Sequence, residues 1–176
     1  AIGRLGKVEE GTTVTDYDPE EHHRHTSLQL ALAPVIWKGT KINVIDTPGY
    51  ADFVGEQVSA LRVADAAILV VSATGGVEVG TEIAWKKLRD MGMPTMIFVS
   101  RMDREHADYD GTMAQICSAL GIRCAAANLP IGAEHDFSGV VDILGDVSGD
   151  MKDAAESALD SLAEAVADTD DELMEK

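Results

Sequence analysis

Two short segments of the chain carry residue types that could bind a phosphate group and a purine base. The first is Asp46, Thr47, Pro48 and Gly49, an Asp-x-x-Gly motif that follows a run rich in Ile and Val. Its carboxylate could orient a water molecule on Mg²⁺, a hard cation that prefers oxygen ligands. The Gly49 N–H, with no Cβ beside it, could approach a terminal phosphate. The same residues also form ordinary turns, so the motif depends on its place after a strand and before a helix.

The second segment is VSRMDRE, residues 99–105, which also follows an apolar run. Asp103 could accept hydrogen bonds from the N1–H and N2–H₂ groups of a guanine, which adenine does not supply. The alternative is that Asp103 caps the helix that follows. This segment therefore predicts either base recognition or a helix start.

Apolar runs and helical patterns alternate around these segments. Short runs rich in Ile and Val, typical of parallel strands buried on both faces, occupy residues 41–47, 66–72 and 95–100. Residues 51–64 and 78–92 carry apolar side chains at helical spacing, as amphipathic helices do. The order predicts a βαβαβ arrangement.

Further elements are expected on both sides of this core. Residues 27–39 alternate and contain Pro34, which favours an edge strand, antiparallel to residues 41–47 through a turn at Gly39 and Thr40. A helix near 107–120 and a short strand near 123–128 would extend the sheet.

The ends of the three central strands carry polar residues. Ligands bind at the carboxyl ends of the strands in an open parallel sheet. Here those ends supply Asp46-Thr47, Ser72-Ala73, and Ser100 with Asp103. We therefore expect a polar ligand at this edge.

Composition narrows the classes of function. The chain has 31 acidic and 14 basic residues and a net charge of -17, which argues against a basic surface wrapped on DNA. No apolar stretch approaches the roughly 20 residues that span a membrane. Cys117 and Cys124 fit neither a zinc site nor a disulfide framework, so we expect buried free thiols in a cytoplasmic protein.

Acidic residues dominate residues 150–176. Within this segment, one apolar face predicts an amphipathic helix over 151–167, and Thr169 with Glu172 resembles a capping box. The helix is either a solvated element packed on the sheet domain or a docking surface for a basic partner. The residues of the apolar face are Met151, Ala155, Leu159, Leu162 and Val166.

Taken together, these motifs resemble those of the translational GTPases, most closely the G domain of the elongation factor G type. DTPGYADFVGE is similar to the family's DTPGHxDF switch II, and SRMDRE stands where the family has NKMD. GGVEVGTEIAW and LPIGAEHDFSGVVDIL also match, so the resemblance runs from about Gly3 to Lys176. It implies an α/β, P-loop NTPase-type G domain with a mostly parallel sheet flanked by helices. It also implies GTP/GDP and Mg²⁺ as ligands and the ribosome as partner.

The resemblance also divides the chain. It implies a partial G domain over residues 1–149, with switch I at about 11–28 and switch II at about 46–62. Residues 150–176 would be the acidic helical part of an insert that the family uses to contact the ribosomal stalk protein.

Two family motifs are missing, the phosphate-binding loop and the last guanine-contacting loop. We therefore expect a fragment that is truncated at both ends and inactive alone. Its parent protein would hydrolyse GTP. GKVEEGTT, residues 6–13, spaces its glycines like a phosphate-binding loop but has Thr12 where the Lys belongs. We interpret it as a chance match.

Departures within the matched motifs affect ligand binding. In switch I the resemblance implies a hydroxyl that binds Mg²⁺ when the terminal phosphate is present, at Ser27 or, as the alternative, at Thr26. His22, His23 and His25 could suggest a metal site, but a contiguous mobile stretch gives poor ligand geometry and favours exposed histidines. Ser100 replaces a family Asn and Arg101 a family Lys, whereas Asp103 is kept. We therefore expect guanine preference with weakened affinity.

Tyr50 stands where the family has the His that orients the attacking water. A phenol, with a pKa of about 10, cannot form the charged imidazolium near neutral pH, although its oxygen can still hydrogen-bond a water. The alternative function is therefore a GTP-binding regulatory or interaction module with little or no hydrolysis.

Overall fold

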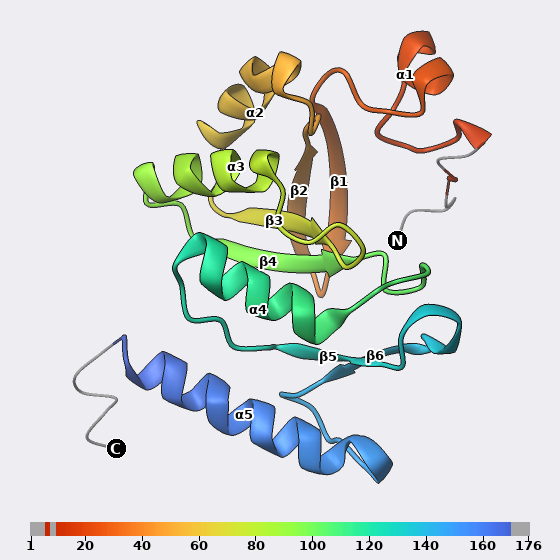
Figure 1. Ribbon diagram of the computed structural model, residues 1–176. Helices are drawn as coiled ribbons and strands as arrows, with labels where there is room; N and C mark the ends of the chain where they lie inside the picture. The colour runs from red at the N-terminus through yellow and green to blue at the C-terminus, as the bar shows by residue number, and fades with distance from the viewer. Residues whose placement is uncertain (1–5, 8–9, 170–176) are drawn as a thin grey trace. The chain divides into compact units, whose positions relative to one another are not determined.

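The computed structural model describes residues 6–7 and 10–169, and Figure 1 shows its helices and strands. The chain divides into two compact units, Ala1–Ala67 and Ile68–Lys176. No helix among the described residues is both long enough and apolar enough to cross a bilayer.

The first unit is built around a β-hairpin. Its elements are α1 (Pro19–Arg24), β1 (Ala31–Trp37), β2 (Thr40–Asp46), the short 3₁₀ helix η2 (Ala51–Phe53) and α2 (Val54–Leu61). The hairpin is antiparallel, as predicted, and pairs Trp37 with Thr40 at one end and Ala31 with Asp46 at the other.

The hairpin turn lies one residue earlier than the predicted one. Lys38 and Gly39 both have positive φ, at 46° and 81°, which is the backbone of a two-residue type I′ turn. This turn sets the register, and the register brings Asp46 opposite Ala31.

The second unit contains the remaining strands and helices. Its elements are β3 (Ala67–Ser72, whose first residue ends the first unit), α3 (Val79–Asp90), β4 (Thr95–Ser100), α4 (Tyr109–Leu120), β5 (Asn128–Ile131), η3 (Glu134–Asp136), β6 (Gly139–Asp142), η4 (Gly149–Met151) and α5 (Lys152–Ala167). β3 pairs with β4, and β5 pairs antiparallel with β6. The sheet pairing among the described residues is therefore three two-stranded sheets rather than one continuous sheet.

β3 and β4 run in the same direction in Figure 1. The N–H just after β3, at Ala73, donates to the carbonyl of Ser100 at the end of β4, over 2.8 Å. The carboxyl ends of the two strands therefore lie side by side, as the sequence predicted for a parallel pair.

Helix α4 is tied to the end of β3 and to α3. The Asp108 N–H and the Thr112 hydroxyl both donate to the carbonyl of Ala73, over 3.2 and 3.4 Å. The Trp85 indole of α3 donates to the carbonyl of Leu120 over 3.3 Å. Buried side chains from β3 and both helices, Leu69, Val71, Leu88, Ile116 and Leu120, form the apolar interior of this unit.

One face of the β3–β4 pair is exposed, so the prediction of strands buried on both faces was wrong here. Successive side chains of a strand point to opposite faces, and Val71 is 1% exposed whereas its neighbour Val70 is 58% exposed. A run of Ile and Val expresses a preference for apolar surroundings but does not supply the element that covers the second face. The exposed side chains on this pair are Ile68, Val70, Met96 and Phe98.

The last strands differ in position from the prediction near 123–128. β5 begins only at Asn128, which pairs with Asp142 at the end of β6. One further bond joins the Ile143 N–H to the Ala127 carbonyl, and then the Leu144 N–H bonds to the Asp142 carboxylate and closes a turn. Residues 123–127 are irregular, and no strand among the described residues pairs with them.

The acidic helix is present as α5 and is only partly covered. Ala155 is buried, whereas Leu159 and Val166 of the same apolar face are exposed. The end of α5 is tied back to the loop after α4 by an ion pair between Asp168 and Arg123. The capping box of Thr169 with Glu172 falls partly outside the described residues.

The interior of the second unit predicts where truncation is costly. Ile116 is 0% exposed, so Ile116→Ala should lower the free energy of unfolding of this chain by about 2–5 kcal/mol, from lost burial and the cavity left behind. Ile83→Ala on α3, where the side chain is 48% exposed, should cost about 1 kcal/mol or less. Urea unfolding measures both, and equal losses would contradict this packing.

Candidate functional site

The Asp-x-x-Gly turn follows β2 directly and is fixed by helix α2. Asp46 is the last residue of β2. Pro48 is fully buried, and the Gln57 side-chain amide of α2 donates to its carbonyl over 2.8 Å. The turn is therefore bound at both ends, by the hairpin register and by α2.

Gly49 occupies open space at the surface of this turn. A Cβ built on it would meet no atom of the chain within 4 Å, and its φ is not in the left-handed region. The chain's own packing and backbone therefore do not require glycine at this position.

Tyr50 follows as an exposed residue at the start of η2. It is the N-cap of η2, and its carbonyl accepts the Phe53 N–H over 3.1 Å. Its side chain is 62% exposed. Among the described residues, no hydrogen bond to the phenol is recorded.

Asp16 holds the candidate hydroxyl ligand of switch I. The hydroxyl of Ser27 donates to Asp16 Oδ1 over 2.7 Å, and that of Thr13 donates to Asp16 Oδ2 over 2.6 Å. Thr26 instead uses its backbone, donating its N–H to the Glu21 carbonyl over 3.3 Å. The structure therefore favours Ser27 over Thr26 as the side chain held in place.

Residues 11–28 contain a helix, which the sequence analysis treated as a mobile loop. α1 begins with a capping box, in which the Asp18 side chain accepts the Glu20 N–H and the Glu21 side chain accepts the Asp18 N–H. Pro19 opens the helix at its first position, where a missing N–H costs nothing.

The three histidines of this segment lie at the end of α1. His23 and His25 are exposed and His22 is half-buried. No group of three or more His, Cys, Asp or Glu suited to a metal ion occurs in the part of the chain that the structure describes. His25 closes the helix in the left-handed conformation, with φ of 52°.

Glu21 is a buried carboxylate that the sequence analysis missed. Its two oxygens accept four backbone N–H groups, two from the residues that follow Asp16 and two from the residues that follow Ser27. Burial raises the pKa of this carboxyl, but the four hydrogen bonds outweigh burial, and the net pKa is lowered. The Asp-x-x-Glu spacing of a capping box was the available sequence signal.

The segment predicted to recognise the base follows β4 in the second unit. Ser100 ends β4, and its hydroxyl donates to the Val71 carbonyl over 3.3 Å, so it ties β4 to β3. Arg101 is exposed with φ of 60°, and its carbonyl accepts the Arg104 N–H. The segment therefore leaves the strand in a tight turn.

Asp103 does not cap the next helix, so that alternative was wrong. α4 begins at Tyr109, and its N-cap is Asp108, whose side chain accepts the Gly111 N–H over 3.0 Å. Asp103 lies in the preceding turn and is exposed. No hydrogen bond to its carboxylate is recorded within residues 6–7 and 10–169.

The turn after β4 is fixed by its neighbours. Met102 is buried with Ala73 and Ala107. Its carbonyl accepts the Glu134 N–H over 2.8 Å, and the Glu134 side chain accepts the His106 N–H over 2.7 Å. Residues on both sides of Asp103 are therefore held, while Asp103 itself faces solvent.

A pocket of about 340 Å³ lies beside this turn, between the start of α4, β5 and the start of α5. Asp103 is not among its lining residues, so it is separate from the predicted base contact. Its lining includes Met102, Asp108, Tyr109, Asp110, Pro130 and Met151.

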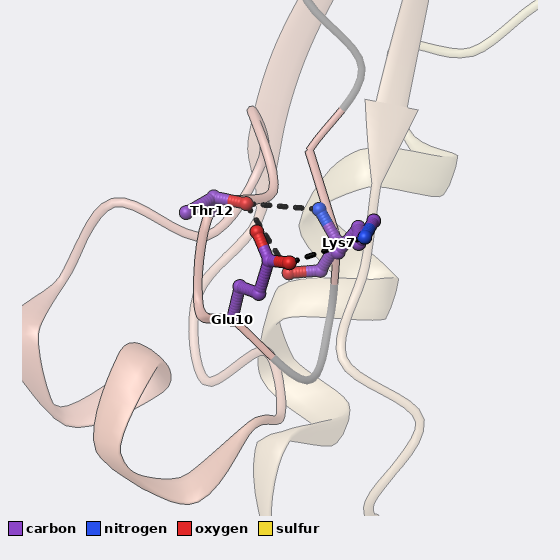
Figure 2. A network of polar contacts seen from close by, with 3 residues as sticks. All are labelled: Lys7, Glu10 and Thr12. Carbon is purple, nitrogen blue, oxygen red and sulfur yellow. Dashed lines mark hydrogen bonds and ion pairs between the residues drawn. The ribbon is translucent and has the colours of Figure 1, made fainter.

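The segment with phosphate-loop spacing is closed on itself (Figure 2). The Lys7 N–H donates to the Thr12 hydroxyl over 2.9 Å, and the Thr12 N–H donates to the Lys7 carbonyl over 3.1 Å. The Lys7 ammonium pairs with Glu10 over 3.1 Å. The N–H groups of Lys7 and Thr12 are thus used within the loop, which agrees with a chance match.

The two cysteines are free and half-buried rather than fully buried. Burial, with the neighbouring Cys117 thiol as the next cause, raises the pKa of Cys124 to about 12. At neutral pH this thiol stays protonated and unreactive.

The predicted residues are divided between the two units. In the first unit lie the turn from Asp46 to Tyr50 and the Ser27 hydroxyl. In the second unit the ends of β3 and β4 join, so Ser72, Ala73, Ser100 and the turn with Arg101 and Asp103 form one group.

Comparison with known proteins identifies the family. The model of the elongation factor Tu GTP binding domain matches residues 1–171. The chain belongs to this family. The resemblance to translational GTPases and the α/β, P-loop NTPase-type fold class are thereby confirmed, and the family is one that binds guanine nucleotides.

Individual relatives agree with this assignment. Elongation factor G of Thermotoga sp. (strain RQ2) is 35% identical, and that of Thermotoga maritima 34% identical, each over 98% of this chain and 27% of the relative. A crystal structure of a protein from Thermus thermophilus has a TM-score of 0.88 and 35% identity, over 98% of this chain and 28% of that one. The chain spans about a quarter of the length of the curated relatives it matches.

The two aspartates near α4 should respond differently to truncation. Asp108→Ala removes the N-cap and should lower the free energy of unfolding by about 1 kcal/mol, whereas Asp103→Ala should leave it within about 0.5 kcal/mol. Urea unfolding compares the two variants, with hydrogen exchange in the first turn of α4 as the local measure. A larger loss for Asp103→Ala would restore the capping role to that residue.

Proposed function

We propose that this chain is the GTP-binding part of an elongation factor G-like GTPase that switches between GTP and GDP on the ribosome. The observation that carries the proposal is the family match over residues 1–171, joined by 35% identity to elongation factor G over 98% of the chain. Asp46 at the end of β2, and Asp103 in the turn that follows β4, agree with it.

The turn after β2 would contact the terminal phosphate. Asp46, Thr47, Pro48 and Gly49 are the proposed nucleotide-binding residues in the first unit. Gly49 supports this role, because the chain's own packing does not require a glycine there. Close approach of a ligand to the Gly49 N–H would require that this residue has no side chain.

Mg²⁺ would be held by oxygen groups of the same unit. Ser27 would ligate it directly, with Thr26 as the alternative, and Asp46 would act through a water. Such a donor set suits a hard cation, and a hydroxyl that donates its proton to Asp16 keeps lone pairs for a metal. When bound, the ion would neutralise charge on the phosphates.

The turn after β4 would recognise the base. Asp103 would accept the guanine N–H groups, since its exposed carboxylate has no recorded partner among the described residues. Arg101 would stack on the ring, and Ser100 would hold the turn by its bond to Val71. Asn at the Ser100 position is the family's usual residue, so we expect guanine preference with reduced affinity.

Hydrolysis of GTP depends mainly on positioning and electrostatics. Tyr50 is the proposed catalytic position, because the resemblance aligns it with the family's water-orienting His. Its exposure suits a residue that a partner brings into place. The ribosome would be that partner, and a ribosomal partner implies a cytoplasmic location. The acidic insert at 150–176 would contact the ribosomal stalk protein.

Base selection is testable by charge removal at Asp103. In the native protein, GDP should bind at least tenfold more tightly than ADP, and Asp103→Asn should weaken GDP binding by about 100-fold, since hydrogen bonds to a charged acceptor are lost. Glu105→Gln removes the same charge two residues away and should change GDP affinity less than twofold. Titration by calorimetry measures both, and equal affinities for GDP and ADP would refute guanine recognition.

The role of Tyr50 is testable by restoring the family residue. Tyr50→His should raise ribosome-stimulated phosphate release by about 100-fold, because an imidazole orients and polarises water better than a phenol near pH 7. Tyr50→Phe keeps the ring and removes the hydroxyl, so it should lower release below that of the wild type. Tight GTP binding with no stimulated release in the wild type would instead favour the regulatory module.

A further inference from the structure

We propose that Glu21 is the positioning residue of switch I, whose buried carboxylate draws residues 17–18 and 28–29 together and so fixes Ser27 beside Asp16. This inference rests on the proposed function, because it assigns the control of the Ser27 hydroxyl, the group proposed to sense Mg²⁺ and the terminal phosphate.

The carboxylate of Glu21 is saturated by backbone N–H groups. Oε2 accepts those of Tyr17 and Asp18, over 3.1 and 3.0 Å. Oε1 accepts those of Leu28 and Gln29, over 2.8 and 3.1 Å. Each oxygen therefore binds one end of the segment, and the carboxylate links two stretches about ten residues apart.

These bonds hold the residues that directly follow Asp16 and Ser27. Asp16 directly precedes Tyr17, and Ser27 directly precedes Leu28. The hydroxyl of Ser27 donates to Asp16 over 2.7 Å. Because Glu21 holds Tyr17 and Leu28, the preceding residues Asp16 and Ser27 lie within hydrogen-bonding distance of each other.

Helix capping explains only part of this arrangement. A capping box requires one bond from the Glu21 side chain, to the N–H of Asp18. Leu28 and Gln29 lie beyond the carboxyl end of α1, where a cap at the amino end has no role. Their two bonds belong to the folding of the loop rather than to the helix.

Burial makes the arrangement specific for an ionised carboxylate. The residue is 1% exposed, and a buried charge is stable only when its hydrogen-bonding capacity is filled. Four donors fill the two oxygens and lower the pKa of the carboxyl despite its burial. A neutral amide offers one oxygen, and its NH₂ group would face N–H donors.

The segment is tied to helix α2 by a hydrogen bond at the residue just before β1. The N–H of Leu30, one residue beyond Gln29, donates to Glu56 Oε2 over 2.9 Å. Glu56 lies beside Gln57, which holds the carbonyl of Pro48. A change at Glu21 is therefore connected, through residues 28–30 and α2, to the Asp-x-x-Gly turn.

The first test measures the loop itself by hydrogen exchange in the native protein. Glu21→Gln should raise exchange of the amides at Tyr17, Asp18, Leu28 and Gln29 by at least tenfold. Glu20→Gln makes the same chemical change at the adjacent residue, which pairs with Arg24 at the surface, and should leave these rates unchanged. Unchanged rates in Glu21→Gln would overturn the proposal, whether or not nucleotide binds.

The second test separates positioning from a general loss of structure. Glu21→Gln should weaken binding of a non-hydrolysable GTP analogue about tenfold at fixed Mg²⁺, and GDP binding less than twofold, because only the former engages Ser27. The Mg²⁺ concentration needed for half-maximal analogue binding should rise correspondingly. Equal weakening for both nucleotides would overturn the positioning role.

Absence of guanine nucleotide binding in the wild type would refute the proposed function and the assignment to Ser27. The hydrogen-exchange test would still decide whether Glu21 holds the four backbone N–H groups.

Discussion

The irregular part of the first unit depends on carboxylates that accept backbone N–H groups. Residues 13–30 contain a single six-residue helix, so the sheet and helix bonds that normally satisfy the backbone are few there. Glu21 and Glu56 supply acceptors for five N–H groups between Tyr17 and Leu30, and Asp16 accepts two hydroxyls. Because a carboxylate has two acceptor oxygens where a backbone carbonyl has one, it can join more donors from distant stretches.

In the second unit, backbone groups at the ends of strands make the corresponding connections. Ala73 sits at the junction, where its N–H bonds to Ser100 and its carbonyl accepts both the Asp108 N–H and the Thr112 hydroxyl. One residue thus joins β3, β4 and α4. The turn that carries Asp103 is held by Glu134, which bonds to Met102 before it and to His106 after it, so the Asp103 side chain faces solvent while the backbone around it is fixed.

The sequence was informative wherever local pattern and long-range packing agreed. β4 lies at its predicted residues, and Pro34 with a turn signal at Gly39 predicted the β1–β2 hairpin, although the turn lies one residue earlier than expected. Patterns failed where a partner decides the outcome, since β5 starts where β6 allows and the second face of β3 depends on what covers it. For the site, the positions of Asp46 at the end of β2 and of Asp103 soon after β4 were predictable. Glu21 was missed: its spacing from Asp18 marks a helix cap, but its bonds to the backbone N–H groups of Leu28 and Gln29 leave no mark in the side-chain sequence.

The charge of the chain constrains how it could bind a nucleotide. A chain with a net charge of -17 repels a phosphate group at long range, and Asp16 and Asp46 add negative charge in the unit that would meet the phosphates. Attraction must then be local, from N–H groups such as that of Gly49 and from a divalent cation placed between carboxylates and phosphates. Engagement of Asp16 by two hydroxyls and of Glu21 by four N–H groups limits this repulsion, because hydrogen-bonded carboxylates present less of their charge to a ligand. Nucleotide binding by this chain should therefore depend more steeply on Mg²⁺ than binding by a basic protein with the same contacts.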